Sequence, residues 1–98
     1  MNNILEDLKL KLNITWEDQD ELLNHIINSS KEYLNYIAGR SIDYTMPFNK
    51  SILLECCRYD YNNARELFEI NFNRELIALQ IKNLVTEVNY DIKWKTIN

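Results

Sequence analysis

The stretch WEDQDELLNHIINSSKEYLNYIAG, residues 16–39, decides the fold because its apolar residues recur at three- and four-residue steps. That spacing places them on one face of an α-helix, which we expect over Trp16–Ala38. The predicted buried face consists of Leu22, Leu23, Ile26, Ile27, Ser30, Tyr33, Leu34 and Ile37. The polar residues Asn24, His25, Asn28, Lys31, Glu32 and Asn35 are expected to lie opposite.

Both ends of this helix carry recognisable signals. Thr15 is predicted to be the N-cap, with Asp18 three residues later as its partner in a capping box. Gly39 stands where a left-handed C-terminal cap is needed, a conformation that glycine reaches without steric cost.

Three further helices are expected around it. A first helix over Ile4–Leu12 has Leu5, Leu8 and Leu12 on one side. A third helix is predicted to start at Pro47 and end near Asn62, with a buried side formed by Ile52, Leu53, Cys56 and Cys57. A fourth is expected over about Ala64–Lys82, with Leu67, Phe68, Phe72, Leu76 and Leu79 buried and a kink or break near Asn71 and Asn73.

The last residues follow a different period. Val88, Tyr90, Ile92 and Trp94 alternate with polar residues, which is typical of a β-strand. The sequence therefore predicts a helical domain over residues 1–83 and an extended arm over residues 84–98. The four apolar residues are the candidate partner-binding residues, and the arm either folds back on its own helices or docks on a neighbouring chain.

Length and composition agree with an all-α class of about four helices. The chain has 98 residues, enough for one domain, and its single Gly and single Pro leave few turns. The formal net charge of −4 lowers the expectation of tight DNA binding, which requires a basic face. No signal peptide or membrane span is evident, so a cytoplasmic protein is expected.

Residue types that often carry chemistry have simpler interpretations here. His25 is the single histidine and lies on the polar face, and Cys56 and Cys57 are adjacent without metal-ligand spacing, so we expect a solvated histidine and two reduced, buried thiols. We therefore predict no catalytic centre, no metal site and no cofactor.

Two charged clusters also have structural explanations. Glu17, Asp18, Asp20 and Glu21 are expected to stabilise a helix N-terminus, since an EF-hand glycine and terminal glutamate are missing. Arg58, Arg65 and Arg74 alternate with acidic residues and with Tyr59 and Tyr61, which favours ion pairs over a phosphate track. A helix-turn-helix reading of the third and fourth helices would place an acidic helix in the DNA groove.

The order of these elements resembles the head–tail connector (adaptor) proteins of long-tailed phages and prophages. The similarity rests on DELL through II to YLNYIAG in residues 20–39, the Pro47-led helix with ILL at residues 52–54, and RYDYNN running into LFE over residues 58–69. It covers about Ile4 to Leu79, and the tail after Asn83 departs from it.

The resemblance implies a structural virion protein at the head–tail interface, made in the host cytoplasm. Its subunits would form a ring beneath the portal protein, expected to be dodecameric when assembled and monomeric when free. The ring would extend the DNA channel without binding DNA specifically and would dock the stopper or tail-completion protein. The alternative from another class is a small helical regulator or antitoxin-like protein that binds a protein partner or DNA, and an enzyme is a distant third.

Overall fold

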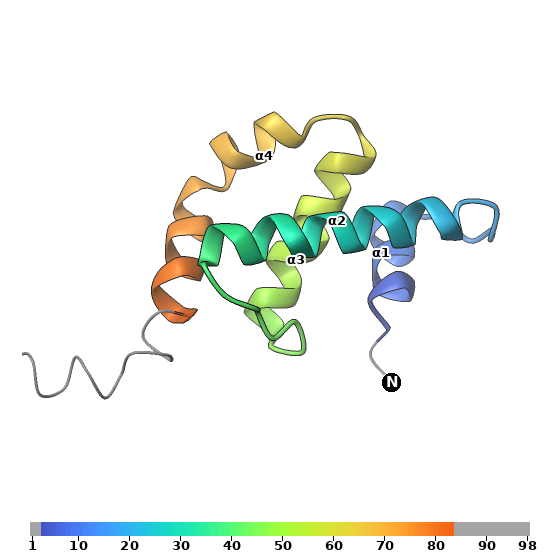
Figure 1. Cartoon of the computed structure of the whole chain (residues 1–98). Helices are drawn as coiled ribbons and strands as arrows, with labels where there is room; N and C mark the ends of the chain where they lie inside the picture. The colour runs from blue at the N-terminus through green and yellow to red at the C-terminus, as the bar shows by residue number, and fades with distance from the viewer. Residues whose placement is uncertain (1–2, 84–98) are drawn as a thin grey trace, which may run out of the picture.

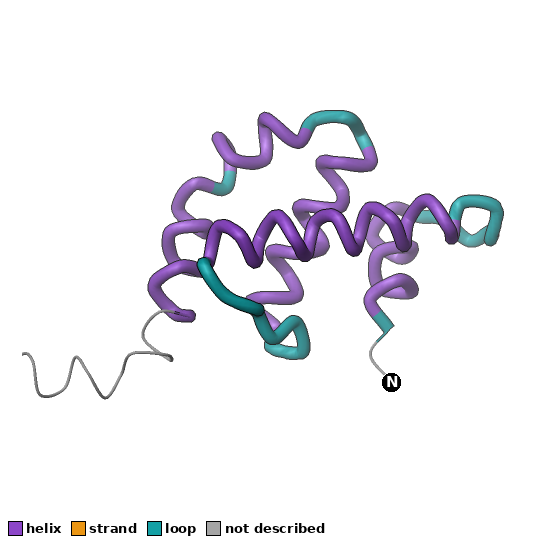
Figure 2. Tube along the Cα trace, viewed as in Figure 1, coloured by secondary structure: helices purple, strands orange, loops and turns teal. Residues whose placement is uncertain are grey.

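The computed structural model describes residues 3–83, which fold into packed helices (Figure 1). Four of them are α1 (Ile4–Leu12), α2 (Asp20–Ala38), α3 (Pro47–Tyr61) and α4 (Arg65–Asn71). Residues 73–83 are helical too, and Figure 2 shows no strand in the part of the chain that the structure describes. The predicted all-α class is confirmed, while the expected strand at Val88–Trp94 lies outside the described residues.

The central helix is α3, which packs against α1, α2 and α4. Because neighbours cover it from several sides, it can bury the adjacent residues Cys56 and Cys57 completely, together with Ile52 and Leu53. Both cysteines are free thiols, as predicted. Burial raises the pKa of the Cys57 thiol to about 12, since a thiolate there would lose its hydration.

The apolar face of α2 supplies much of the remaining core. Leu23, Ile26, Ile27 and Leu34 are buried as predicted. The expectation for Leu22 was wrong, because this side chain is 49% exposed. Leu22 lies about 100° around the helix from Leu23, and the core covers only the side on which Leu23 lies.

The start of α2 differs from the prediction. The helix begins at Asp20 after Gln19, without a side-chain cap, so the predicted cap at Thr15 was wrong. Contacts with other helices explain the later start. The Lys9 ammonium pairs with Asp20 at 2.7 Å, and the Tyr61 hydroxyl donates to Gln19 Oε1 at 2.6 Å. These contacts fix the first turn of α2 against α1 and α3.

The other helix ends follow local rules. Asn3 caps α1 by accepting the Leu5 N–H at 2.9 Å. Asn13 (φ 60°) and Gly39 (φ 78°) end α1 and α2 in the left-handed conformation that these residue types tolerate. Pro47 opens α3, as predicted.

The predicted fourth helix is divided in two. A turn at Asn62 and Asn63 (φ 58°) separates α3 from α4, and a second break at Phe72 separates α4 from residues 73–83. The expected interruption near Asn71 and Asn73 is thus confirmed. Leu67 was predicted to be buried but is 49% exposed, because α4 turns only the side with Phe68 toward the core.

Phe68 is the centre of an aromatic cluster that holds α4 on the domain. Its ring lies 5.0 Å from Phe72, 5.7 Å from Tyr59 and 6.4 Å from Tyr33, measured between centroids. Such pairs add to the stabilisation from buried area. The cluster joins α4 to both α2 and α3.

Ion pairs link α1 to α3 on the surface. Glu55 lies 2.6 Å from Lys11 and 2.7 Å from Arg58, and Lys50 pairs with Asp7 at 2.6 Å. Partial burial acts to raise the pKa of Glu55, but hydrogen bonds from Lys11 and Arg58 outweigh it, so the pKa is lowered overall.

Candidate partner-binding surfaces

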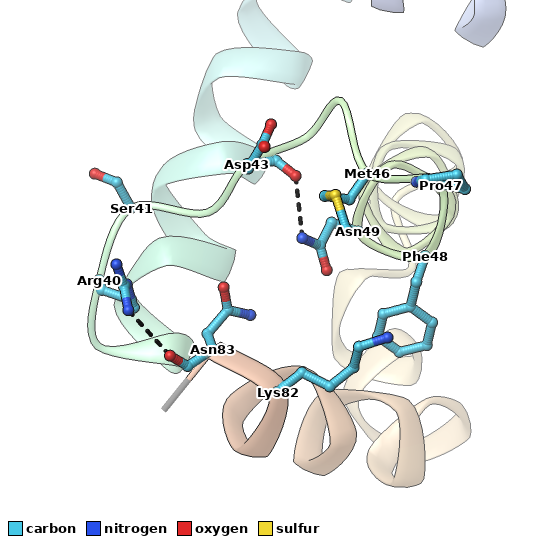
Figure 3. Close-up of a pocket in the computed structure, with 9 residues that line it drawn as sticks. All are labelled: Arg40, Ser41, Asp43, Met46, Pro47, Phe48, Asn49, Lys82 and Asn83. Atoms are coloured by element: carbon cyan, nitrogen blue, oxygen red, sulfur yellow. Dashed lines mark hydrogen bonds between the residues drawn. The ribbon is translucent and has the colours of Figure 1, made fainter. Parts of the chain in front are cut away.

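A pocket of about 380 Å³ lies where the loop at residues 40–46 meets the start of α3 and the end of the helical residues 73–83 (Figure 3). Its lining consists of Arg40, Ser41, Asp43, Met46, Pro47, Phe48, Asn49, Lys82 and Asn83. Two segments build the pocket, residues 40–49 and residues 82–83, which lie far apart in the sequence. No local sequence motif contains both of them.

The loop side of the pocket is held by the side-chain amides of Asn35, which is half-buried, and Asn49, which is buried. Asn35 Oδ1 accepts the Ile42 N–H at 3.1 Å and the Tyr44 hydroxyl at 2.9 Å, which holds the loop on α2. The Asn49 amide donates to the Asp43 carbonyl at 3.0 Å (Figure 3). Asn35 was expected on the solvated face of α2, but the structure uses it as a half-buried anchor for this loop.

The lining combines two cationic side chains, the Asp43 carboxylate and the apolar residues Met46, Pro47 and Phe48. The Lys82 ammonium lies 4.4 Å from the centroid of the Phe48 ring, and the Arg40 guanidinium donates to the Asn83 carbonyl at 3.0 Å (Figure 3). The second bond ties the loop at residue 40 to the helical residues 73–83. The lining offers shape, apolar surface and positive charge, which suit an apolar side chain flanked by a carboxylate.

Asn83 is the last described residue, so the chain continues from the edge of this pocket. The predicted partner-binding residues Val88, Tyr90, Ile92 and Trp94 belong to that continuation and lie outside the described residues.

A second surface lies at the corner between α1 and α2. Trp16 is 50% exposed and Leu22 is 49% exposed, and Glu17, Asp18 and Glu21 are exposed around them. We call these five residues the acidic corner. The fourth carboxylate of the predicted cluster, Asp20, is paired with Lys9 instead. The cluster thus contributes one residue to the fold and three to the surface.

A third surface follows α4 and residues 73–83. Leu67, Ile70, Ile77 and Ile81 are between 47% and 70% exposed, and Arg74 is exposed among them. We call these five residues the outer stripe. In residues 73–83, positions 74, 77 and 81 share one side of the helix, while Leu76 and Leu79 on the other side are buried. Sequence reasoning missed this surface, although the run of apolar residues at 76–79 exceeds what one buried face can accommodate.

The remaining candidates have structural roles or none. His25 is exposed on α2, as predicted. Arg58 pairs with Glu55 and Arg65 with Asp60, which confirms the predicted ion pairs for these two arginines. No group of three or more potential metal ligands occurs within residues 3–83.

Arg65 also organises the interior beside α2. Its guanidinium donates to Ser30 Oγ at 3.1 Å and lies 4.8 Å from the Tyr33 ring centroid. The Tyr33 hydroxyl in turn donates to Glu69. These contacts attach the start of α4 to α2 and account for the fully buried Ser30.

The helix-turn-helix alternative finds little support in these surfaces. The second helix of such a motif would be α4, which has seven residues and exposes Glu66 and Glu69. A recognition helix lies close to DNA phosphates, and exposed carboxylates on that helix would repel them. Along residues 3–83, none of the helices is both long and apolar enough to cross a membrane.

Comparison with known families identifies a related family. The family model described as phage gp6-like head-tail connector protein matches residues 2–95. The matched region includes Val88–Trp94, which the resemblance drawn from sequence patterns had left out. Comparisons with curated proteins and with solved structures found no match.

Proposed function

Because the chain belongs to the phage gp6-like head–tail connector family, we propose that it is a subunit of a ring beneath the portal that extends the DNA channel. The family is one of structural components of the virion, and the match over residues 2–95 is the observation that carries the proposal. The subunit would join the ring after synthesis in the host cytoplasm, and it would dock the stopper or tail-completion protein on the side away from the portal.

The surface of the subunit supports assembly. Nine large apolar side chains among the described residues are 47% to 85% exposed, in a chain too small to cover them with a larger core. Contacts between subunits would bury such residues. We infer that the free subunit is monomeric and that the assembled ring is dodecameric.

Charge supports passage of DNA without retention. The net charge of −4 disfavours tight binding to phosphates, so DNA would pass through the ring without specific contacts. We propose no catalytic activity and no cofactor, since the pocket and the surfaces provide docking chemistry only.

The arm at residues 84–98 is proposed to pair with another chain in the assembled connector. Val88, Tyr90, Ile92 and Trp94 alternate with polar residues, and such a strand gains ladder partners when it is added to a sheet or groove on a neighbour. The arm follows Asn83, a residue that lines the pocket.

The test is complementation of phage particles. A phage whose copy of this gene carries a stop codon should accumulate DNA-filled heads and separate tails, because the joint between them is missing. Addition of the purified chain should restore joining and infectivity. Normal particles in the mutant would contradict the proposed function, and so would a block at an earlier stage such as capsid assembly.

A further inference from the structure

The acidic corner and the part of the outer stripe in residues 73–83 lie at opposite ends of α2. The corner leads directly into the first turn at Asp20, whereas residues 73–83 contact the other end, where the Gln80 amide donates to the Ile37 carbonyl at 3.0 Å. The 19 residues of α2 span roughly 28 Å at about 1.5 Å per residue. Figure 1 shows this separation, with the corner beyond one end of α2 and residues 73–83 against the other. One subunit cannot bring its own two surfaces together.

The acidic corner and the part of the outer stripe in residues 73–83 have matching apolar centres and opposite charge. Trp16 and Leu22 are half-exposed in the corner, and Ile77 and Ile81 are half-exposed in the stripe. Glu17, Asp18 and Glu21 surround the first pair, while Arg74 lies beside the second on the same side of its helix. Burial of the apolar centres would therefore bring carboxylates to the guanidinium.

We propose that the outer stripe of one subunit binds the acidic corner of the next copy of the chain. Pairing of the corner with itself would place three carboxylates against three, and pairing of the stripe with itself would oppose the two Arg74 side chains. Like charges that meet in an interface cost binding energy and select against that arrangement. The arrangement that pairs opposite charges is the one between unlike surfaces.

A contact between unlike surfaces leaves one of each free on every dimer. It therefore propagates from subunit to subunit, and it closes into a ring when the rotation between subunits allows. The inference rests on the proposed function, for which it supplies the contact between neighbouring subunits. It assigns Trp16, Leu22, Ile77 and Ile81 to the centre of that contact and Arg74 to its charged edge.

Cysteine cross-linking tests the pairing directly. The full-length chain carrying both Trp16→Cys and Ile77→Cys is assembled on portal-bearing heads and treated with a short bifunctional thiol reagent. We expect a ladder of cross-linked multimers from the double variant and monomers from each single variant, since the native Cys56 and Cys57 are buried. A dimer from Ile77→Cys alone would show a like-with-like contact and overturn the proposal.

Charge reversal provides a second, independent test. Arg74→Glu and Glu21→Arg should each lower the association constant between subunits by at least about tenfold. The two changes together should restore much of the lost affinity, because the ion pair between the subunits is then present with its charges exchanged. Glu32→Arg is the matched control, an exposed carboxylate of α2 outside both surfaces. Equal loss in the control, or no restoration in the double variant, would contradict the pairing.

Particle assembly of the wild-type chain distinguishes failure of this contact from failure of the proposed function. Wild-type rings on portals, together with a Trp16→Cys, Ile77→Cys double variant that assembles but does not cross-link, would overturn this contact and leave the proposed function standing. Failure of the wild-type chain to join any portal-bearing head would overturn both.

Discussion

Replacement of Phe68 by alanine should weaken the packing of α4 against the other helices. Phe68 is completely buried, and its ring contacts Tyr33, Tyr59 and Phe72. Loss of a buried Phe side chain costs about 3–5 kcal/mol through lost burial and the cavity that remains. We expect a value of about 4 kcal/mol, because residues from three helices surround the ring and cannot all collapse into the space.

The assay is urea unfolding of the full-length chain, followed by far-ultraviolet circular dichroism. A loss of about 4 kcal/mol is a large share of the 5–15 kcal/mol typical of a domain, and it should lower the melting temperature by roughly 15–30 °C. Ile70→Ala is the matched control on the same helix, since its side chain is 70% exposed and its loss should change stability by less than about 0.5 kcal/mol. A loss below about 1 kcal/mol for Phe68→Ala, or equal losses in both variants, would refute the described packing of α4.

Four further results are expected. Ile27→Ala, which truncates a buried residue of α2, should cost about 2–5 kcal/mol in a chemical melt, and less than about 0.5 kcal/mol would mean that the face assignment of α2 is wrong. Cys56 and Cys57 should resist a water-soluble thiol reagent until the chain is unfolded, and rapid labelling of the native chain would contradict their burial. Burial raises the pKa of Cys57 from 9.0 to about 12, so the folded state holds this proton more tightly than the unfolded state does. The contribution of Cys57 to stability is therefore complete below about pH 9 and declines as the pH rises toward 12. Cys57→Ala should flatten this decline of stability with pH, and an unchanged slope would contradict the raised pKa of Cys57. Deletion of Asn89–Asn98 should leave the thermal stability of the free subunit unchanged and abolish its incorporation into portal-bound particles, whereas a large loss of stability would show that the arm packs on its own helices.

Features with a local cause could be predicted from the sequence. The bounds of α1, the left-handed cap at Gly39 and the start of α3 at Pro47 each follow from a residue type with a restricted conformation or from helical spacing. The break at Phe72 was anticipated because poor helix formers flank it.

Features that depend on contacts distant in sequence could not be predicted. The start of α2 depends on Lys9 and Tyr61, which lie on other helices. The exposure of Leu22 and Leu67 depends on how wide a face the neighbouring helices cover, and spacing alone does not give that width. The pocket combines Arg40 and Phe48 with Lys82, residues that no single motif contains.

The outer stripe could have been predicted from the sequence pattern of residues 73–83. Ile77 and Ile81 share a helix with the buried Leu76 and Leu79, so apolar residues occur on both sides of it. A helix with apolar residues on two sides usually has two packing partners. Here one partner is the domain itself, and the second is the neighbouring subunit that we propose.

The central claim is that the chain forms a ring at the head–tail joint, and electron cryomicroscopy of the portal vertex tests it most directly. DNA-filled heads isolated with the chain bound would be reconstructed around the portal axis. We expect a closed ring of helical subunits beneath the portal, with twelve copies and α3 central in each. A portal vertex without density for the chain, in heads that have joined their tails, would contradict the account.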